Sequence, residues 1–117
     1  MTDHGASPDP CCEIVITADD SDWLAVFART LVDERLAACA HVIADIRAIY
    51  RWAGSVHDDA QSRIAVHSRT SLVPAILARA DAEHPDLVPC VIVLPIISGQ
   101  PAYLRWIHEE TVDPDAT

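Results

Sequence analysis

The sequence predicts an α+β domain, in which an antiparallel sheet is covered on one face by two helices. Three observations lead to this fold class. Apolar and polar residues alternate along several segments, which is typical of half-buried strands. Two other segments carry apolar residues at the 3.6-residue spacing of a helix lying on a sheet. The predicted order is strand, helix, strand, strand, helix, strand, with a third helix after the last strand.

The first strand and helix are predicted between residues 12 and 36. Alternation along residues 12–17 indicates a strand that ends at Ala18. Residues 19–22 (Asp-Asp-Ser-Asp) offer helix N-cap side chains and first-turn acids. In the helix that follows, one apolar stripe is expected to be buried: Leu24, Phe27, Ala28 and Leu31.

A long hairpin is predicted over residues 39–69. Every even position from 42 to 52 is apolar, which predicts one continuous apolar face: Val42, Ala44, Ile46, Ala48, Tyr50 and Trp52. Residues 53–55 form the turn, and Gly54 is free to adopt a positive φ. Each strand is about twice the usual length of ~5–6 residues. Such a hairpin extends beyond a small domain, so we expect a second subunit to bury Tyr50 and Trp52.

The second half of the chain completes the fold. A helix capped by Thr70 or Ser71 is expected to bury Leu72, Ile76, Leu77 and Ala80 and to end before Pro85. Residues 88–97 are almost continuously apolar, which predicts a strand buried on both faces. Pro101 begins a short helix with Tyr103, Leu104, Trp106 and Ile107 on its apolar side. This order of elements is that of the ferredoxin-like split βαβ arrangement.

The composition of the chain excludes some classes of binding partner. The chain has 117 residues, a formal net charge of −10 and no lysine. An acidic surface repels phosphate backbones and anionic lipids, so we expect neither nucleic acid nor a membrane as partner. An acidic surface favours the binding of cations instead. No apolar run approaches the ~20 residues of a membrane span.

The two ends of the chain indicate the domain boundaries, and the cysteines indicate the cellular compartment. Residues 1–10 lack the basic and apolar regions of a signal peptide and are expected to be a disordered tail, as is the acidic segment 112–117. Residues 11–111 then form the domain. The four cysteines form no CxxC pair and no disulfide framework, so a reducing cytoplasm is expected.

Catalytic motifs are absent from the sequence, and no catalytic residue is predicted: there is no GxSxG, no glycine-rich phosphate loop and no HExxH. Metal binding is the better candidate. His84 and Cys90 flank a short loop, and Cys39 and His41 lie two apart on one strand. Imidazole and thiolate together suit copper(I) or zinc. The alternatives are a capping histidine at a helix end and cysteines buried as small apolar residues.

Aromatic residues and two arginines form the remaining candidates. Packing in the core or at an interface is favoured over a ligand-binding role for Tyr50, Trp52, Tyr103 and Trp106. Arg47 and Arg51 lie on the opposite face of the strand. They are either exposed charges or interface residues that pair with Asp58 or Asp59 of a neighbouring subunit.

A set of short motifs then points to a family. In order these are residues 16–18 (ITA), 34–39 (ERLAAC), 49–54 (IYRWAG), 84–85 (HP) with 88–89 (VP), 94–96 (LPI), and 103–107 (YLRWI). Together, over residues 13–111, they resemble the CutA family of divalent-cation tolerance proteins. The resemblance implies a ferredoxin-like subunit in a homotrimer, binding of copper and other divalent metals, and an architecture similar to the PII signalling trimers.

The resemblance also implies metal contacts. The histidine of the family's His-Pro motif is His84. A cysteine that some members use on the first strand corresponds to Ile16, which cannot bind a metal. Asp86 stands in place of a tyrosine and Cys90 in place of a glutamate. A set of His84, Asp86 and Cys90 is softer than the family's oxygen-rich version, and it is expected to prefer copper(I) or zinc.

Three functions follow as hypotheses. The first is a cytoplasmic, non-catalytic trimer that binds copper or zinc in metal tolerance or homeostasis. The second is a PII-like sensor or adaptor that binds a small molecule between subunits, where Tyr50, Trp52 and Trp106 gather. The third, an acylphosphatase-type hydrolase, is suggested by the fold alone, and the arginine-bearing anion loop that it needs is missing between residues 18 and 23.

Overall fold

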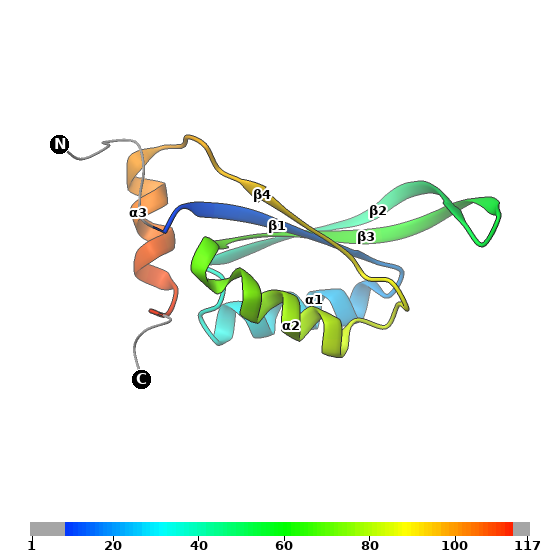
Figure 1. Ribbon diagram of the computed structural model, residues 1–117, viewed down its shortest axis with the longest axis horizontal. Helices are drawn as coiled ribbons and strands as arrows, with labels where there is room; N and C mark the ends of the chain where they lie inside the picture. The colour runs from blue at the N-terminus through cyan, green and yellow to red at the C-terminus, as the bar shows by residue number, and fades with distance from the viewer. Residues whose placement is uncertain (1–8, 114–117) are drawn as a thin grey trace.

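The computed structural model describes residues 9–113, and it confirms the predicted ferredoxin-like α+β fold. Four antiparallel strands form one sheet in the order β2-β3-β1-β4. Figure 1 shows α1 and α2 side by side on one face of the sheet, α3 at one end, and the β2–β3 hairpin extending from the other end. The elements are β1 (Cys11–Ala18), α1 (Ser21–Asp33), β2 (Cys39–Trp52), β3 (Ser55–Arg69), a 3₁₀ turn (Thr70–Leu72), α2 (Val73–Glu83), β4 (Cys90–Pro95) and α3 (Pro101–Glu110).

The core lies between the sheet and its two helices. The Asp20 side chain caps α1 by accepting a hydrogen bond from the Trp23 N–H at 2.9 Å. The predicted stripe of α1 is buried, and it packs on strand residues that point to the same side: Ile14, Ile16, Ile64 and Val66. Each such side chain contributes roughly 1.5–3 kcal/mol by leaving water. The opposite side of the sheet carries Glu13, Thr17 and His67. We call this side the second face.

The predicted stripe of α2 is only partly correct. Leu72, Ile76 and Ala80 are buried, but Leu77 is 39% exposed. α2 contacts the core through a narrow line of residues spaced three and four apart, and Leu77 falls outside this line. The helix ends at Glu83. His84 has an extended backbone, ψ 133°, as predicted for a residue before proline.

The hairpin turn confirms one sequence prediction. Trp52 pairs with Ser55, and the two residues between them, Ala53 and Gly54, have φ values of 52° and 84°. Two positive φ angles in a two-residue loop define a type I′ turn, whose twist matches that of the flanking strands. The strands that it joins have 14 and 15 residues.

The predicted continuous apolar face of β2 is wrong, because a β-bulge interrupts the strand. Ile43 pairs with Arg63 and Ile46 with Gln61, so β2 holds one residue more than β3 at this point, and Asp45 has a φ of 61°. One extra residue moves all later side chains to the other face. Val42, opposite Ile64, therefore faces the helices, whereas the even residues from 46 onward lie on the second face.

The prediction that β4 is buried on both faces is also wrong for the single chain. Ile92 is 51% exposed, and Val93 and Leu94 are half-exposed as well. β4 pairs only with β1 and forms an edge of the sheet. Its apolar run, together with exposed residues of β2, leaves the second face with an apolar area that one chain does not cover.

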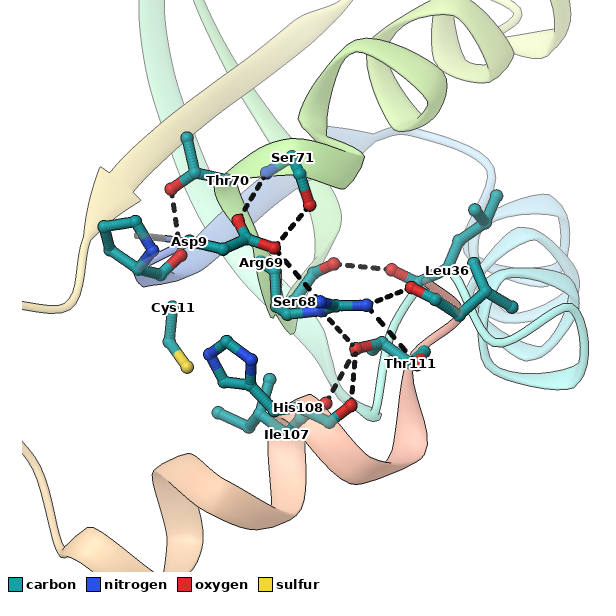
Figure 2. A network of polar contacts seen from close by, with 12 residues as sticks. Asp9, Cys11, Leu36, Ser68, Arg69, Thr70, Ser71, Ile107, His108 and Thr111 are labelled. Atoms are coloured by element: carbon teal, nitrogen blue, oxygen red, sulfur yellow. Dashed lines mark hydrogen bonds and ion pairs between the residues drawn. The ribbon is translucent and has the colours of Figure 1, made fainter. Parts of the chain in front are cut away.

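Arg69 links both ends of the described chain to β3 (Figure 2). Its buried guanidinium donates from Nε to Thr111 Oγ1 at 2.8 Å, from Nη1 to Asp9 Oδ2 at 3.1 Å and from Nη2 to the Val112 carbonyl. Asp9 also accepts from the backbone N–H of Ser71, at 2.8 Å, and from its hydroxyl. Asp9 and Val112, which lie just outside the predicted domain 11–111, are thus held to its body. The domain boundaries themselves remain a prediction, and residues 1–8 and 114–117 of the predicted tails lie outside the described residues.

This network makes stability depend on pH. Burial opposes ionisation of Asp9, but the hydrogen bonds from Ser71 and the charge of Arg69 outweigh it and lower the pKa of the carboxyl. Its stabilising effect is therefore complete above the unfolded pKa of ~3.9 and is lost as pH falls towards the folded pKa. We expect Asp9→Asn to cost about 1–3 kcal/mol at pH 7, where hydrogen bonds to a charged group are lost. In urea unfolding, the gap to wild type should narrow below pH ~4; a gap independent of pH would contradict this assignment.

Candidate functional site

A cavity of about 730 Å³ lies at the base of the hairpin. The second half of β2 lines one side with Ile46, Ala48, Tyr50 and Trp52. The end of β1 and the loop of residues 86–90 line the other side. The bulge in β2 creates this arrangement, because it moves Tyr50 and Trp52 to the second face.

Carboxylates give the pocket a negative potential. Asp19 and Asp86 lie in its wall. The Tyr50 hydroxyl donates a hydrogen bond to Asp59 Oδ2 at 2.6 Å. This bond, followed by burial and the negative charges of Asp59, Asp19 and Asp86, raises the pKa of Tyr50 to about 12. Three carboxylates thus act on one hydroxyl group, and their combined field favours a cation in the pocket.

His84, predicted as a metal ligand, uses both ring nitrogens within the chain. Its side chain is buried, and Nδ1 accepts a hydrogen bond from the Asp86 N–H at 3.0 Å. The ring is therefore the neutral tautomer with the proton on Nε2, which donates to the Thr17 carbonyl at 2.9 Å. The rings of His84 and Trp23 also pack in an edge-on arrangement, with centroids 5.0 Å apart. His84 thus holds the 86–90 loop against β1, and a ligand role for it remains a prediction.

Two other predicted ligands, Asp86 and Cys90, do line the pocket, together with Tyr50 and Trp52. Cys90 is an exposed free thiol at the start of β4, where it pairs with Thr17. The structure thus brings together two predicted donors and two predicted pocket aromatics. Their roles as ligand or pocket residues remain predictions.

Arg47 and Trp106 lie away from this pocket. Arg47 forms a bidentate pair with Asp58 of its own chain, with N···O distances of 2.8 and 2.6 Å. Pairing of Arg47 with a neighbouring subunit stays a prediction. Trp106 lies on α3, where it stacks on Tyr103 with ring centroids 5.5 Å apart. Within one chain, Trp106 therefore does not join Tyr50 and Trp52.

Sequence reasoning missed a second group of polar side chains. At the α3 end of the second face, the Cys39 thiol lies 3.5 Å from His67 Nδ1 and 3.1 Å from the Tyr103 hydroxyl. His67 Nε2 lies 3.0 Å from Glu13 Oε1. The strand register places Glu13 opposite His67 and His67 opposite Cys39. Correct pairing of the three strands would have revealed this row, whereas spacing along one strand only suggested Cys39 with His41.

Two further features are absent from residues 9–113. No three histidine, cysteine, aspartate or glutamate side chains are grouped as a metal ion requires. In the same range, no helix is both long and apolar enough to span a bilayer.

Comparison with known proteins identifies the family. The profile of the family described as CutA1 divalent ion tolerance protein matches residues 12–110. The divalent-cation tolerance protein CutA of Thermus thermophilus is 37% identical over 98 residues, which are 84% of this chain and 95% of that protein. Mouse protein CutA is 35% identical over 107 residues, or 92% of this chain, and the match spans 60% of the mouse protein.

Solved structures agree with this assignment. The crystal structure of CutA1 from Oryza sativa superimposes with a TM-score of 0.84 at 32% identity, covering 89% of this chain and 95% of that one. The structure of the Thermus thermophilus divalent cation tolerance protein has a TM-score of 0.83 at 35% identity, with 87% and 99% covered. Both sequence and fold lead to the same conclusion: the chain belongs to the CutA1 divalent ion tolerance family.

Proposed function

We propose that this protein is a non-catalytic homotrimer that binds copper or zinc in divalent-metal tolerance or homeostasis. The observation that carries the proposal is the acidic pocket at the base of the hairpin. It places the Asp86 carboxylate and the Cys90 thiol in one wall, with Asp19 in the same pocket. The family's description as divalent ion tolerance proteins supports a role for metal ions.

The donor types favour copper and zinc. A site made only of carboxylates would suit magnesium or calcium, whereas a thiolate selects softer ions. Cys90 is exposed, so an ion can reach it without unfolding the chain. His84 then acts by positioning, since its bond to the Asp86 N–H holds the loop that carries both donors.

Exposed apolar residues support the trimer. Ile43, Ile92 and Leu94 on the second face are about half-exposed, as is Trp52 near the tip of the hairpin. An apolar area of this kind on a sheet marks an interaction surface, and a second and third copy of the chain would cover it. The free state of all four cysteines supports the proposed cytoplasmic location.

Titration of the reduced protein with zinc and copper(I) under anaerobic conditions tests the proposed metal site. We expect micromolar or tighter binding in wild type. In an Asp86→Asn/Cys90→Ser double variant the affinity for zinc should fall at least tenfold, because both predicted donors are removed. Asp81→Asn, which makes a charge change on the exposed side of α2, is the matched control. Equal affinity in the double variant and wild type would refute the site.

The size of the cavity favours a second candidate, a PII-like sensor for a small molecule. At about 730 Å³ it lies within the ~300–1,000 Å³ typical of ligand pockets, and Tyr50 and Trp52 offer aromatic surfaces. A thermal-shift screen of nucleotides and metabolites would separate the two functions. Stabilisation by one organic compound in metal-free buffer, lost in Trp52→Ala, would favour the sensor.

A further inference from the structure

We propose a second metal site on this chain, in which Cys39 Sγ, His67 Nδ1 and the Tyr103 hydroxyl bind a zinc-like ion and Glu13 orients His67. The site lies at the α3 end of the second face, away from the pocket that holds Cys90. The inference rests on the proposed function in one respect, namely that the ligand is a metal ion. The two sites share no residue.

The backbone brings these groups together from four elements. β1, β3 and β2 contribute Glu13, His67 and Cys39 as directly opposed residues, so their side chains leave the sheet on the same face. Pro101 begins α3, and its first turn places Tyr103 over this row. Strands and a helix hold donors more rigidly than loops do.

The orientation of His67 is the strongest argument. A carboxylate only accepts hydrogen bonds, so Glu13 requires the proton on His67 Nε2, 3.0 Å away. The lone pair of Nδ1 then points at the Cys39 thiol and the Tyr103 hydroxyl. A histidine whose second nitrogen donates to a carboxylate is the usual arrangement at a metal, since the carboxylate fixes the ring and increases its basicity.

The spacing of the donors fits a tetrahedral ion. Zinc–sulfur and zinc–nitrogen bonds of ~2.3 and ~2.05 Å at a tetrahedral angle separate sulfur from nitrogen by about 3.6 Å. The observed distance from Cys39 Sγ to His67 Nδ1 is 3.5 Å. The Tyr103 hydroxyl now bridges the two, at 3.1 and 2.5 Å, and has to move outward by about an ångström to become the third donor. In the single chain, Tyr103 is 36% exposed.

The other cysteines lack this environment. Cys11 and Cys12 are buried, and burial raises the pKa of both thiols, that of Cys12 to about 11. They therefore stay protonated and bind metals poorly. Among the hydrogen bonds of residues 9–113, the one between Cys39 and His67 is the only contact of a thiol with an imidazole.

Cobalt(II), a spectroscopic substitute for zinc, tests the site in the reduced full-length chain. In a Cys90→Ser background, which removes the thiolate of the other proposed site, we expect a thiolate-to-cobalt charge-transfer band in the near ultraviolet that saturates at one ion per chain and is bleached by zinc. Cys39→Ser, added to this background, should lose the band. Glu13→Gln should keep it but weaken binding by about 10–100-fold, since Glu13 only orients the ligand. His108→Gln, an imidazole on α3 outside the cluster, should bind as wild type, and circular dichroism should confirm that each variant is folded.

These experiments distinguish failure of the further inference from failure of the proposed function. A band that survives in Cys39→Ser and disappears in Cys90→Ser overturns the inference and leaves the pocket site standing. Absence of the band in folded wild type overturns the inference too, and zinc titration of Asp86→Asn/Cys90→Ser then decides the proposed function alone. A band that Cys39→Ser and Cys90→Ser each reduce, and that the Cys39→Ser/Cys90→Ser double variant loses, supports both.

Discussion

Replacement of Ile92 by aspartate is expected to dissociate the proposed trimer. Ile92 is 51% exposed in the single chain, so an isolated subunit would tolerate the change at little cost. In a trimer that covers the second face, the carboxylate would be buried without a partner, and this costs several kcal/mol at each of three interfaces. The solution mass, measured by light scattering after size exclusion, should fall from that of three chains to that of one.

A matched variant separates this effect from general damage. Val26, on the outer side of α1, is 65% exposed, and Val26→Asp introduces the same charge away from the second face. It should leave the trimer intact. A wild-type mass of one chain, or an Ile92→Asp protein that remains trimeric with an unchanged melting temperature, would refute the proposed interface.

Replacement of Arg69 by methionine is expected to destabilise the subunit strongly. The side chain is 11% exposed, and its charge pairs with Asp9 while it also donates to Thr111 and Val112. Methionine keeps most of the apolar contact but removes the guanidinium charge that pairs with Asp9. Loss of one partner of a buried pair costs about 3–5 kcal/mol. Urea unfolding at a fixed protein concentration, followed by circular dichroism, measures the loss.

An exposed ion pair provides the control. Arg29 and Asp33 lie one turn apart on α1, and their side chains are 79% and 59% exposed. Arg29→Met should change the free energy of unfolding by less than ~0.5 kcal/mol, because solvent screens exposed pairs. If Arg69→Met had an equally small effect, the network at the chain ends would contribute no more than a surface contact.

Much of the fold was predictable because its signals are local. The alternation along residues 12–17, the stripe from Leu24 to Leu31 and the positive φ of Gly54 each depend on residues that are close in sequence. Similarly, the break at His84 follows from the proline beside it. Strand and helix periods therefore sufficed to predict the order of elements and the antiparallel sheet.

The candidate sites were harder to predict because they depend on pairing between distant segments. Asp86 and Cys90 were identified from the loop, but their position opposite Tyr50 depends on the bulge at Asp45. The Cys39–His67 contact joins residues 28 positions apart, and Tyr103 is 64 positions from Cys39. Spacing along one strand carries no information about such contacts.

The sequence by itself determined the class of fold, the acidic character and the family resemblance, since periodicity, composition and short motifs are properties of the linear chain. The tertiary structure decided which face Tyr50 and Trp52 occupy, that both nitrogens of His84 are used by backbone partners, and that Glu13, His67 and Cys39 form a row. The physical reason is register. A single extra residue in β2 moves every later side chain across the sheet, and neither hydrophobicity nor spacing in the sequence marks where it is inserted.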